Sequence, residues 1–472
     1  MGRALDRIFC IAAGQEHTRK KNTAISRSHR YLNYGLLSIA TRLEGMGVPA
    51  IQVQGNFDSP SETMLACVDL EIDRTDWPIF VSIPSFYALS WAKAFIDEFK
   101  GMFPGRGIVV GGRWVVGEHP QNLDLHLGGV DTVVAGTAEE KLVEIISSYP
   151  KVRPVKFLTN EMMSARLQLD YRLLHARSSY QPSIEVSRGC GMGCSFCQER
   201  DEKLTPLRPA KFVLEEIEAT VVEDKWGMMS PYLEASVFMP NRKWASEIRD
   251  GYRERSLAFQ WRGEARVDSV SPDVLEILSE AGLKVIDLGL ESASLAQLSR
   301  MRKTPNPKLY LQRASALLKK AHSLGVRAKV NILLFAGEGM GTVSETMDWL
   351  ERHREYVSGV SVGPVMVFGW DEAVGGYIEE MKSYGASLSS SSLLTGVRSM
   401  NLSSEIDHEA SLSISNEISR SFMTATQYFE LKSFSYFERS YRYGDFCRDV
   451  MADPGSYGFR LDDNVRSNID KL

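Results

Sequence analysis

The sequence has few cysteines, no long apolar run and no large excess of charge of either sign. Six cysteines in 472 residues exclude a disulfide-rich secreted scaffold and suit the reducing cytoplasm, where thiolates stay available as metal ligands. No apolar run approaches the roughly 20 residues of a membrane-spanning helix, and the first residues lack a signal-peptide pattern. A net charge of −5 gives no electrostatic reason to expect a nucleic-acid partner. We therefore expect a cytoplasmic protein that contacts neither membrane nor nucleic acid.

Three of the six cysteines are concentrated in one short stretch. Cys190, Cys194 and Cys197 form a C-x3-C-x2-C run directly after an apolar segment typical of a strand, and chance would produce this spacing with a probability on the order of 10⁻³. Three thiolates on one loop can hold three irons of a 4Fe–4S cluster and leave the fourth iron open. Structural cysteines have no reason to cluster. A closed zinc site normally needs a fourth Cys or His, and the nearest histidines are the distant His175 and His322. A non-catalytic zinc or iron–sulfur protein is the weakest alternative.

The first third alternates short apolar runs with helix-like stretches, which indicates a parallel α/β sheet of Rossmann type. Its expected strands are residues 7–11, 49–53, 78–82, 107–110 and 131–134. Ligands of such sheets bind beyond the carboxyl ends of the strands, where small residues let a bulky ligand approach the backbone. Those residues here are Ser82, Gly111, Gly112 and Gly136. No Gly-x-Gly-x-x-Gly turn follows the first strand, so we do not expect a dinucleotide.

The alternation resumes after a connector that contains several prolines. The expected strands are residues 183–187, 232–238, 258–262, 285–290, 327–334 and 360–367. Six parallel strands with intervening helices favour a partial (β/α)6 barrel with its active site at the carboxyl strand ends. The remaining C-terminal residues include an aromatic, helix-like stretch. The sequence thus predicts an α/β protein with a Rossmann-like domain at 1–148, a connector at 149–182, a barrel at 183–370 and a mainly helical cap at 371–472.

The cysteine stretch, with Phe196 before the last cysteine, resembles the signature of the radical S-adenosylmethionine superfamily. Three later segments are arranged much as in the branch of that superfamily that carries a cobalamin-binding domain: Trp261–Asp268, Leu288–Ser292 and Leu334–Thr342. Two segments of the first third resemble the cobalamin-binding domain itself: Val109–Gly112 and Val133–Glu139. A domain that keeps this shape without the cofactor is the alternative for the first third.

The resemblance implies a 4Fe–4S cluster on Cys190, Cys194 and Cys197, whose open iron binds S-adenosylmethionine. An electron from a donor such as flavodoxin or ferredoxin would cleave that molecule to a 5′-deoxyadenosyl radical. Cobalamin, near the four small residues named above, would then deliver a methyl group to a substrate radical, so the product would be a C-methylated small metabolite or peptide. The alternative is a radical enzyme that does not methylate and instead catalyses a rearrangement, ring contraction, oxidation or decarboxylation.

The resemblance also points to residues that would contact S-adenosylmethionine. Phe196 lies inside the signature itself. A cation should meet the carboxylate, and Arg266 is the best candidate; the ribose hydroxyls want a carboxylate or amide, which Glu291 or Asn331 could supply. Each has a structural alternative: Arg266 could pair with Asp268, Glu291 could favour the following helix N-terminus, and Asn331 could be hydrogen-bonded within the strand layer.

Two features depart from the expected pattern. Relatives carry acidic residues after the second barrel strand to receive the amino group of S-adenosylmethionine, but here only Glu234 is acidic in Glu234–Pro240. Asp124–Gly129 matches D-x-H-x-x-G, a motif by which some proteins ligate cobalt, but it lies between the fourth and fifth strands instead of after the first. We therefore interpret the match as a coincidence and His126 as a surface or structural residue.

Overall fold

The computed structural model describes residues 6–15, 24–149, 168–223, 230–390, 394–452 and 457–465. The chain forms two compact units. Unit 1 comprises Met1–Tyr180, Phe368–Gly375 and Leu393–Val397, and unit 2 comprises the rest. The chain thus returns to unit 1 twice, once at the expected boundary near residue 370 and once after it. The division into four consecutive segments stays a prediction.

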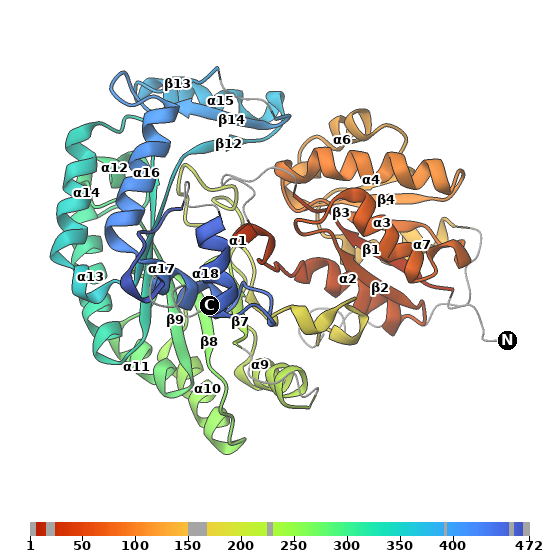
Figure 1. The fold of residues 1–472 in the computed structure, drawn as a ribbon, viewed down its shortest axis with the longest axis horizontal. Coiled ribbons are helices and arrows are strands. Elements are labelled where there is room, and N and C mark those ends of the chain that lie inside the picture. The colour runs from red at the N-terminus through yellow and green to blue at the C-terminus, as the bar shows by residue number, and fades with distance from the viewer. Residues whose placement is uncertain are drawn as a thin grey trace. The chain divides into compact units, whose positions relative to one another are not determined.

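Unit 1 is built on a five-stranded parallel sheet in the order β2-β1-β3-β4-β5 (Figure 1). Its strands are β1 (Ile8–Ala12), β2 (Ala50–Gln54), β3 (Ile79–Ser82), β4 (Ile108–Gly111) and β5 (Thr132–Val134). Every residue of β1 is buried, as expected for a parallel strand covered on both faces. The five predicted strands are confirmed to within one residue at each end. This doubly wound order has its topological switch point between β1 and β3, where such sheets bind their ligands.

Helices pack on this sheet through apolar faces. They are α2 (Tyr34–Gly45), α3 (Pro60–Asp69), α4 (Leu89–Met102), α6 (Pro120–Leu127) and α7 (Leu142–Ser147). On α4, Trp91, Phe95 and Phe99 recur every four residues, which puts them on one face, and all three are fully buried. Trp91 and Phe95 stack with ring centroids 5.2 Å apart. Burial of each such ring contributes roughly 2–3 kcal/mol.

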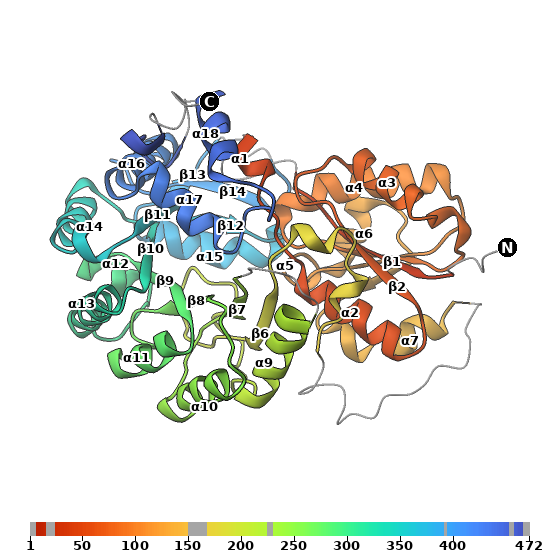
Figure 2. The same ribbon diagram turned by 60° about the horizontal axis from the view of Figure 1, so that its bottom comes forward.

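Unit 2 is built on a six-stranded parallel sheet whose strands follow in chain order, β11-β10-β9-β8-β7-β6. They are β6 (Ser183–Ser187), β7 (Tyr232–Ala235), β8 (Trp261–Arg266), β9 (Leu283–Glu291), β10 (Arg327–Leu334) and β11 (Gly359–Pro364). The connecting helices gather on one face of the sheet (Figure 2): α9 (Ala210–Ile217), α10 (Arg242–Glu254), α11 (Pro272–Glu280), α12 (Leu295–Arg300), α13 (Pro307–Ser323) and α14 (Met340–Arg352). This is the strand order that a (β/α) barrel requires, and it confirms the predicted parallel α/β arrangement.

The other face of this sheet is polar. Along β10 the side chains alternate between partly exposed and buried, and the partly exposed positions include Lys329 and Asn331. The same alternation explains why the prediction of β8 at 258–262 was wrong by several residues. The apolar residues Leu257 and Phe259 are buried in a loop, whereas the strand itself carries Arg262 and Arg266 on its polar face. A search for apolar residues therefore placed the strand too early.

The C-terminal part of unit 2 is mainly helical, as predicted, with α15 (Asp371–Ser383), α16 (His408–Phe422), α17 (Ala425–Ser433) and α18 (Tyr443–Ala452). A small sheet was not predicted: β12 (Met366–Phe368), β14 (Val397–Asn401) and β13 (Ser387–Leu388). The aromatic stretch forms core, since Phe437 and Phe446 are buried. The sequence gives no apolar run here, because β12 and β13 have three and two residues and β14 contains Arg398, Ser399 and Asn401.

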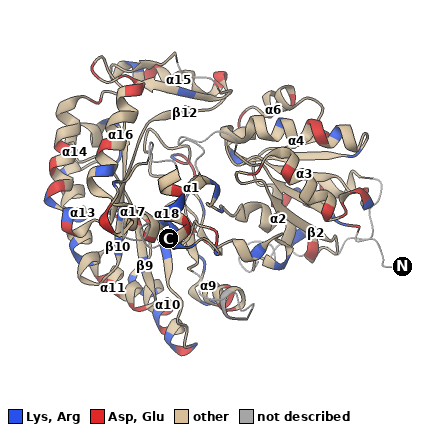
Figure 3. Cartoon of the chain, viewed as in Figure 1, with Lys and Arg blue, Asp and Glu red and all other residues tan. Residues whose placement is uncertain are grey.

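Charges of both signs are interspersed along the outer helices (Figure 3). The ion pair between Lys320 Nζ of α13 and Glu276 Oε2 of α11, 2.9 Å apart, is typical of this surface. Such pairs stabilise the fold by at most about 1 kcal/mol. Within the described ranges, no helix combines the length and apolar character needed to cross a bilayer.

Candidate functional site

The cysteine loop begins directly after β6 and owes its path to three glycines. Gly189, Gly191 and Gly193 have φ angles of 75°, 64° and 71°, a left-handed conformation that other residues adopt only at a cost. A β-carbon on Gly189 would lie 2.4 Å from the carbonyl oxygen of Lys203. Glycine is therefore required there by backbone conformation and by space, and the sequence between the cysteines is part of the site.

Backbone hydrogen bonds hold the loop from two sides. The amide of Cys190 donates to Glu202 O at 3.0 Å, and that of Gly193 donates to Arg200 O at 3.1 Å. The amide of Ser195 donates to Met301 O at 2.9 Å, which joins the loop to the segment after α12. Backbone hydrogen bonds to two other segments thus hold the loop that carries the three cysteines.

The thiols lie at the carboxyl end of β6, with Cys194 buried and Cys190 and Cys197 half-buried. Burial raises the pKa of Cys197 to about 11 and also raises that of Cys190. In the described parts of the chain, no three Cys, His, Asp or Glu side chains are gathered closely enough to hold a single metal ion. A 4Fe–4S cluster makes a different demand, because each cysteine ligates its own iron.

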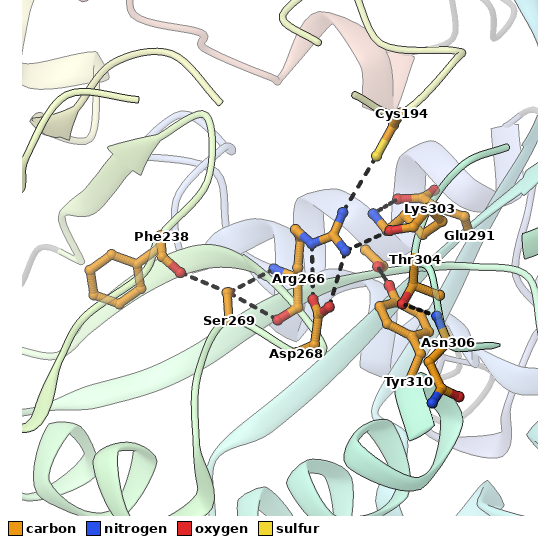
Figure 4. A network of polar contacts seen from close by, with 11 residues as sticks. Cys194, Phe238, Arg266, Asp268, Ser269, Glu291, Lys303, Thr304, Asn306 and Tyr310 are labelled. Carbon is orange, nitrogen blue, oxygen red and sulfur yellow. Dashed lines mark hydrogen bonds and ion pairs between the residues drawn. The ribbon is translucent and has the colours of Figure 1, made fainter. Parts of the chain in front are cut away.

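Arg266, the last residue of β8, connects the cysteine loop to its surroundings (Figure 4). Its Nε and Nη2 donate to the two carboxylate oxygens of Asp268 at 2.9 and 3.1 Å. Nη2 also donates to Lys303 O at 2.7 Å, and Nη1 donates to Cys194 Sγ at 3.4 Å. The structure places Arg266 beside Cys194, and Arg266 forms the ion pair with Asp268 that was its structural alternative.

A second ion pair lies beside this network and joins Lys303 to Glu291. Lys303 Nζ lies 2.9 Å from Glu291 Oε1 and 5.8 Å from the centre of the Phe196 ring. Only 5% of the Lys303 side chain is exposed. Glu291, at the end of β9, has a φ of 68°, a strained conformation that is rare for glutamate and is often found at functional sites. The site thus brings together the predicted Phe196, Arg266 and Glu291 in one region.

Lys303 was missed by the sequence reasoning. It follows α12 in the polar run Met301–Thr304, which looks like an exposed loop. Its burial depends on contacts with β9 and with the cysteine loop, which are distant in sequence. A lysine shortly after Glu291 could indicate a site residue only if the ends of β6 and β9 were already known to lie close together.

Asn331 is located on the polar face of β10, opposite Gly289 in the strand register. Its Oδ1 accepts a hydrogen bond from Lys329 Nζ at 2.8 Å. Lys329 Nζ is also 3.3 Å from Asp287 Oδ1. The hydrogen bond within the strand layer, which was the structural alternative for Asn331, is therefore present.

Glu234 does not lie beyond the second strand but inside it. Its Oε1 accepts a hydrogen bond from Ser183 Oγ, 3.0 Å away at the start of β6. Protein encloses the carboxyl group, and this burial raises the pKa of Glu234 to about 8. Glu264 of β8 was also missed by the sequence reasoning; its Oε2 accepts from Tyr232 Oη at 3.2 Å. Both carboxyl groups belong to the polar face of the sheet.

In unit 1, the four predicted small residues meet at one edge of the sheet. Ser82 ends β3 beside Gly111, which ends β4, and Gly111 in turn pairs with Val134 of β5. A β-carbon on Gly136 would meet no atom within 4 Å, whereas one on Gly112 would lie 2.1 Å from Ile83 O. Gly112 is thus explained by packing alone. Gly136 is exposed and has a φ of 77°, a left-handed conformation that favours glycine.

His126 lies on α6. This helix comes between β4 and β5 in the sequence and does not follow β1. Burial, and secondarily the positive charge of Lys93, lowers its pKa. The side chain is half-buried, and its interpretation as a surface or structural residue stays a prediction.

The family model described as the radical SAM superfamily matches residues 184–350. This range contains the cysteine loop, Arg266, Glu291 and Lys303. An uncharacterised methyltransferase of Pyrococcus horikoshii is 24% identical over 172 residues, which cover 36% of this chain and 36% of that protein.

Two solved structures resemble the chain over most of its length. One is the radical S-adenosylmethionine methyltransferase TsrM of Kitasatospora setae, with a TM-score of 0.60 and 16% identity over 82% of this chain and 79% of that one. The other is the cobalamin-dependent S-adenosylmethionine radical enzyme OxsB, with a TM-score of 0.58 and 15% identity over 80% of this chain. The chain spans about half of OxsB, 55% of its length. At these identities the likeness concerns the fold.

Proposed function

We propose, because residues 184–350 belong to the radical S-adenosylmethionine superfamily, that the chain is a radical enzyme. In this proposal Cys190, Cys194 and Cys197 hold a 4Fe–4S cluster, and S-adenosylmethionine binds its open iron. A cobalamin in unit 1 makes the enzyme a methyltransferase that acts on carbon of a small metabolite or peptide.

The observation that carries the proposal is the cysteine loop at the carboxyl end of β6. Its donor set fits the cluster, since three thiols share one loop that backbone hydrogen bonds hold in place, and a fourth iron would be left without a protein ligand. When bound and reduced, such a cluster supplies the electron that cleaves the sulfonium of S-adenosylmethionine to a 5′-deoxyadenosyl radical. The chain's own contribution is to position that molecule through the residues around Phe196.

Cobalamin is supported by the sheet of unit 1. The order of its strands places a switch point at β1 and β3, and Ser82, Gly111 and Gly136 lie at the carboxyl edge. Gly136 fits a broad ring because open space surrounds it. OxsB was solved with aqua-cobalamin bound, and TsrM with cobalamin and a 4Fe–4S cluster. Cobalamin would supply the methyl group.

The substrate class is supported by the polar face of the unit 2 sheet. Glu264, on a central strand, is exposed on that face, and its carboxyl group would accept a hydrogen bond from a small molecule or a peptide side chain. TsrM was solved with a tryptophan substrate. We also propose a flavodoxin- or ferredoxin-like electron donor and a location in the cytoplasm, where all six cysteines, which are free, would remain reduced.

Anaerobic reconstitution with iron and sulfide tests the radical chemistry. The wild type is expected to bind a 4Fe–4S cluster and to release 5′-deoxyadenosine from S-adenosylmethionine, and Cys194→Ala is expected to abolish that release. Cys447→Ala, at a buried cysteine of α18, is the matched control and should retain it. Zinc as the sole bound metal, or unchanged turnover in Cys194→Ala, contradicts the proposal.

Methylation is tested by mass analysis of products from a substrate panel, with S-adenosylmethionine labelled in its methyl group. A product heavier by one labelled methyl group supports the proposal. Release of 5′-deoxyadenosine with an unmethylated product, by an enzyme that takes up no cobalamin, supports the non-methylating alternative.

A further inference from the structure

Glu264 is the exposed residue in the strands of the large sheet of unit 2. Every other residue of these six strands, all of which the structure describes, is buried or half-buried. Glu264 lies on β8, which has a neighbouring strand on each side. Burial and the negative charge of Asp287 raise the pKa of Glu264, whereas the positive charge of Lys329 lowers it. A solute can therefore reach this carboxyl group although protein lies around it.

Glu264, Asp287 and Lys329 lie at one level on three neighbouring strands. Glu264 pairs with Asp287 in the register of β8 and β9, and Asp287 pairs with Lys329 in that of β9 and β10. Neighbouring strands are about 4.8 Å apart, so the backbones of Glu264 and Lys329 are about 10 Å apart. Both side chains are long, and a small molecule can bridge the distance that remains between their charged ends.

The charges at this level do not form matched pairs. Asp287 Oδ2 accepts a hydrogen bond from Arg262 Nε at 2.5 Å, and Asp287 Oδ1 lies 3.3 Å from Lys329 Nζ. One carboxylate thus serves two cations, which leaves one positive charge uncompensated. Among the described residues Glu264 forms no ion pair, and its Oε2 accepts a neutral hydrogen bond from Tyr232 Oη at 3.2 Å. A positive and a negative charge therefore lie on either side of Asp287.

Lys329 and Glu264 also keep capacity for hydrogen bonds to a ligand. The ammonium of Lys329 carries three N–H groups, and one of them donates to Asn331 Oδ1 at 2.8 Å. Its contact with Asp287 Oδ1 is an ion pair without a hydrogen bond. An ionised carboxylate accepts at about four sites, and Tyr232 occupies one of those of Glu264. The two groups can thus engage a carboxylate and an ammonium that belong to one molecule.

We propose that the substrate is a free α-amino acid, whose ammonium binds Glu264 and whose carboxylate binds Lys329. The inference rests on the proposed function and deepens it, because it selects the small metabolite over the peptide. A residue inside a peptide carries neither charge on its backbone. A ligand with a charge of one sign would leave either Glu264 or Lys329 uncompensated in the bound complex, which is costly where water is excluded.

The first test varies the ligand and leaves the protein unchanged. The twenty standard α-amino acids are titrated into the anaerobically reconstituted wild type by isothermal titration calorimetry. The amino acid that binds most tightly is then compared with its decarboxylated amine and with its desamino acid. Each truncated compound is expected to have a Kd about tenfold to a hundredfold higher, the value of one lost hydrogen bond between charged groups.

The second test assigns each charge of the ligand to its residue. Glu264→Gln is expected to weaken the amino acid by the same factor and to leave the Kd of the desamino acid nearly unchanged, because that compound lacks the group that Glu264 binds. Lys329→Met is expected to weaken the amino acid and to leave the decarboxylated amine nearly unchanged. If Lys329→Met does not fold, the ligand series on the wild type and Glu264→Gln still decides the question.

Glu276→Gln is the matched control for Glu264→Gln, since it makes the same change in an ion pair on the outer helices, and it should alter no Kd. The inference is overturned if none of the twenty amino acids binds, or if the desamino acid and the amine bind as tightly as the amino acid. It is also overturned if Glu264→Gln weakens the desamino acid as much as the amino acid. Failure of the proposed function is a distinct result, because the wild type would then bind no cluster or release no 5′-deoxyadenosine.

Discussion

Among the described residues of unit 2, Arg262 is the charged side chain with the least exposure. None of its side chain is exposed. Its Nε donates to Asp287 Oδ2 at 2.5 Å, and its Nη1 donates to Leu431 O at 2.6 Å. Asp287 balances this charge and that of Lys329. Removing one partner of a buried pair leaves the other uncompensated, which costs more than the pair itself contributes.

Asp287→Asn is therefore expected to destabilise the protein by about 3–5 kcal/mol. Differential scanning calorimetry measures this as a lower midpoint of thermal unfolding. Glu276→Gln breaks the exposed pair with Lys320 and should cost no more than about 1 kcal/mol. Equal shifts for the two variants would show that the burial of the Arg262 pair has no energetic consequence.

Glu234 makes stability depend on pH. Burial raises its pKa from 4.5 to about 8 in the folded chain, so between these values the folded state binds more protons than the unfolded state. Stability must then decrease as pH rises through this window. Glu234→Gln removes the titration and keeps the shape. The midpoint of the variant should rise relative to that of the wild type between pH 5 and pH 8. A difference that is constant over this range would contradict the assignment.

At the residue scale, the sequence predicted which residues lie near the cysteine loop better than it predicted which residues they contact. Cys190, Cys194 and Cys197 could be identified as candidate metal ligands because they lie close together in the sequence itself, so no knowledge of the fold is needed. Arg266 and Glu291 could be placed near the site because they end neighbouring strands. Lys303 could not, because its burial depends on the meeting of α12 with the cysteine loop, and no local pattern encodes that contact.

At the scale of elements, the cysteine loop depends on glycines that are required for different reasons. Gly189 and Gly193 have nearly the same φ, 75° and 71°, but a β-carbon would lie 2.4 Å from Lys203 O at Gly189 and meet nothing within 4 Å at Gly193. Alanine costs about 1–2 kcal/mol in this conformation at either position. Only at Gly189 does a clash with backbone add to that cost.

Gly189→Ala should therefore lose most of its iron and sulfide after reconstitution, while Gly193→Ala keeps most of both. Iron and acid-labile sulfide per chain are the measurements. Equal cluster content in the two variants would mean that the packing of the loop against Lys203 does not shape the cysteine site.

The strands of unit 1 and most of the strands of the large sheet of unit 2 could be predicted, because buried parallel strands appear in the sequence as apolar runs. β8 was misplaced because Arg262, Glu264 and Arg266 lie on it, and a polar inner face hides a strand from a search for apolar residues. The strands β12 and β13 have only three and two residues, and β14 interrupts its apolar residues with Arg398, Ser399 and Asn401, so none of the three forms an apolar run. The part of unit 2 that could not be predicted from the sequence is thus the polar face of its sheet, which is the face that the proposed function involves.

At the scale of the whole molecule, the two proposed cofactors belong to different compact units. The three cysteines lie in unit 2, and Ser82, Gly111 and Gly136 lie in unit 1. Each unit has its own sheet, so loss of one cofactor should leave the residues of the other in place.

Cys194→Ala is accordingly expected to take up hydroxocobalamin as the wild type does, although it lacks an intact cluster. Absorbance of the desalted protein measures the bound corrinoid. Corrinoid loss in step with cluster loss would contradict the assignment of the two cofactors to separate units.

The central claim is that three cysteines hold a cluster whose fourth iron is open to S-adenosylmethionine. Electron paramagnetic resonance of the reconstituted, reduced wild-type protein tests it most directly, with and without S-adenosylmethionine. The account predicts a 4Fe–4S signal that changes when S-adenosylmethionine is added, because the ligand binds the open iron. A signal that S-adenosylmethionine leaves unchanged, or the absence of any cluster signal, would contradict it.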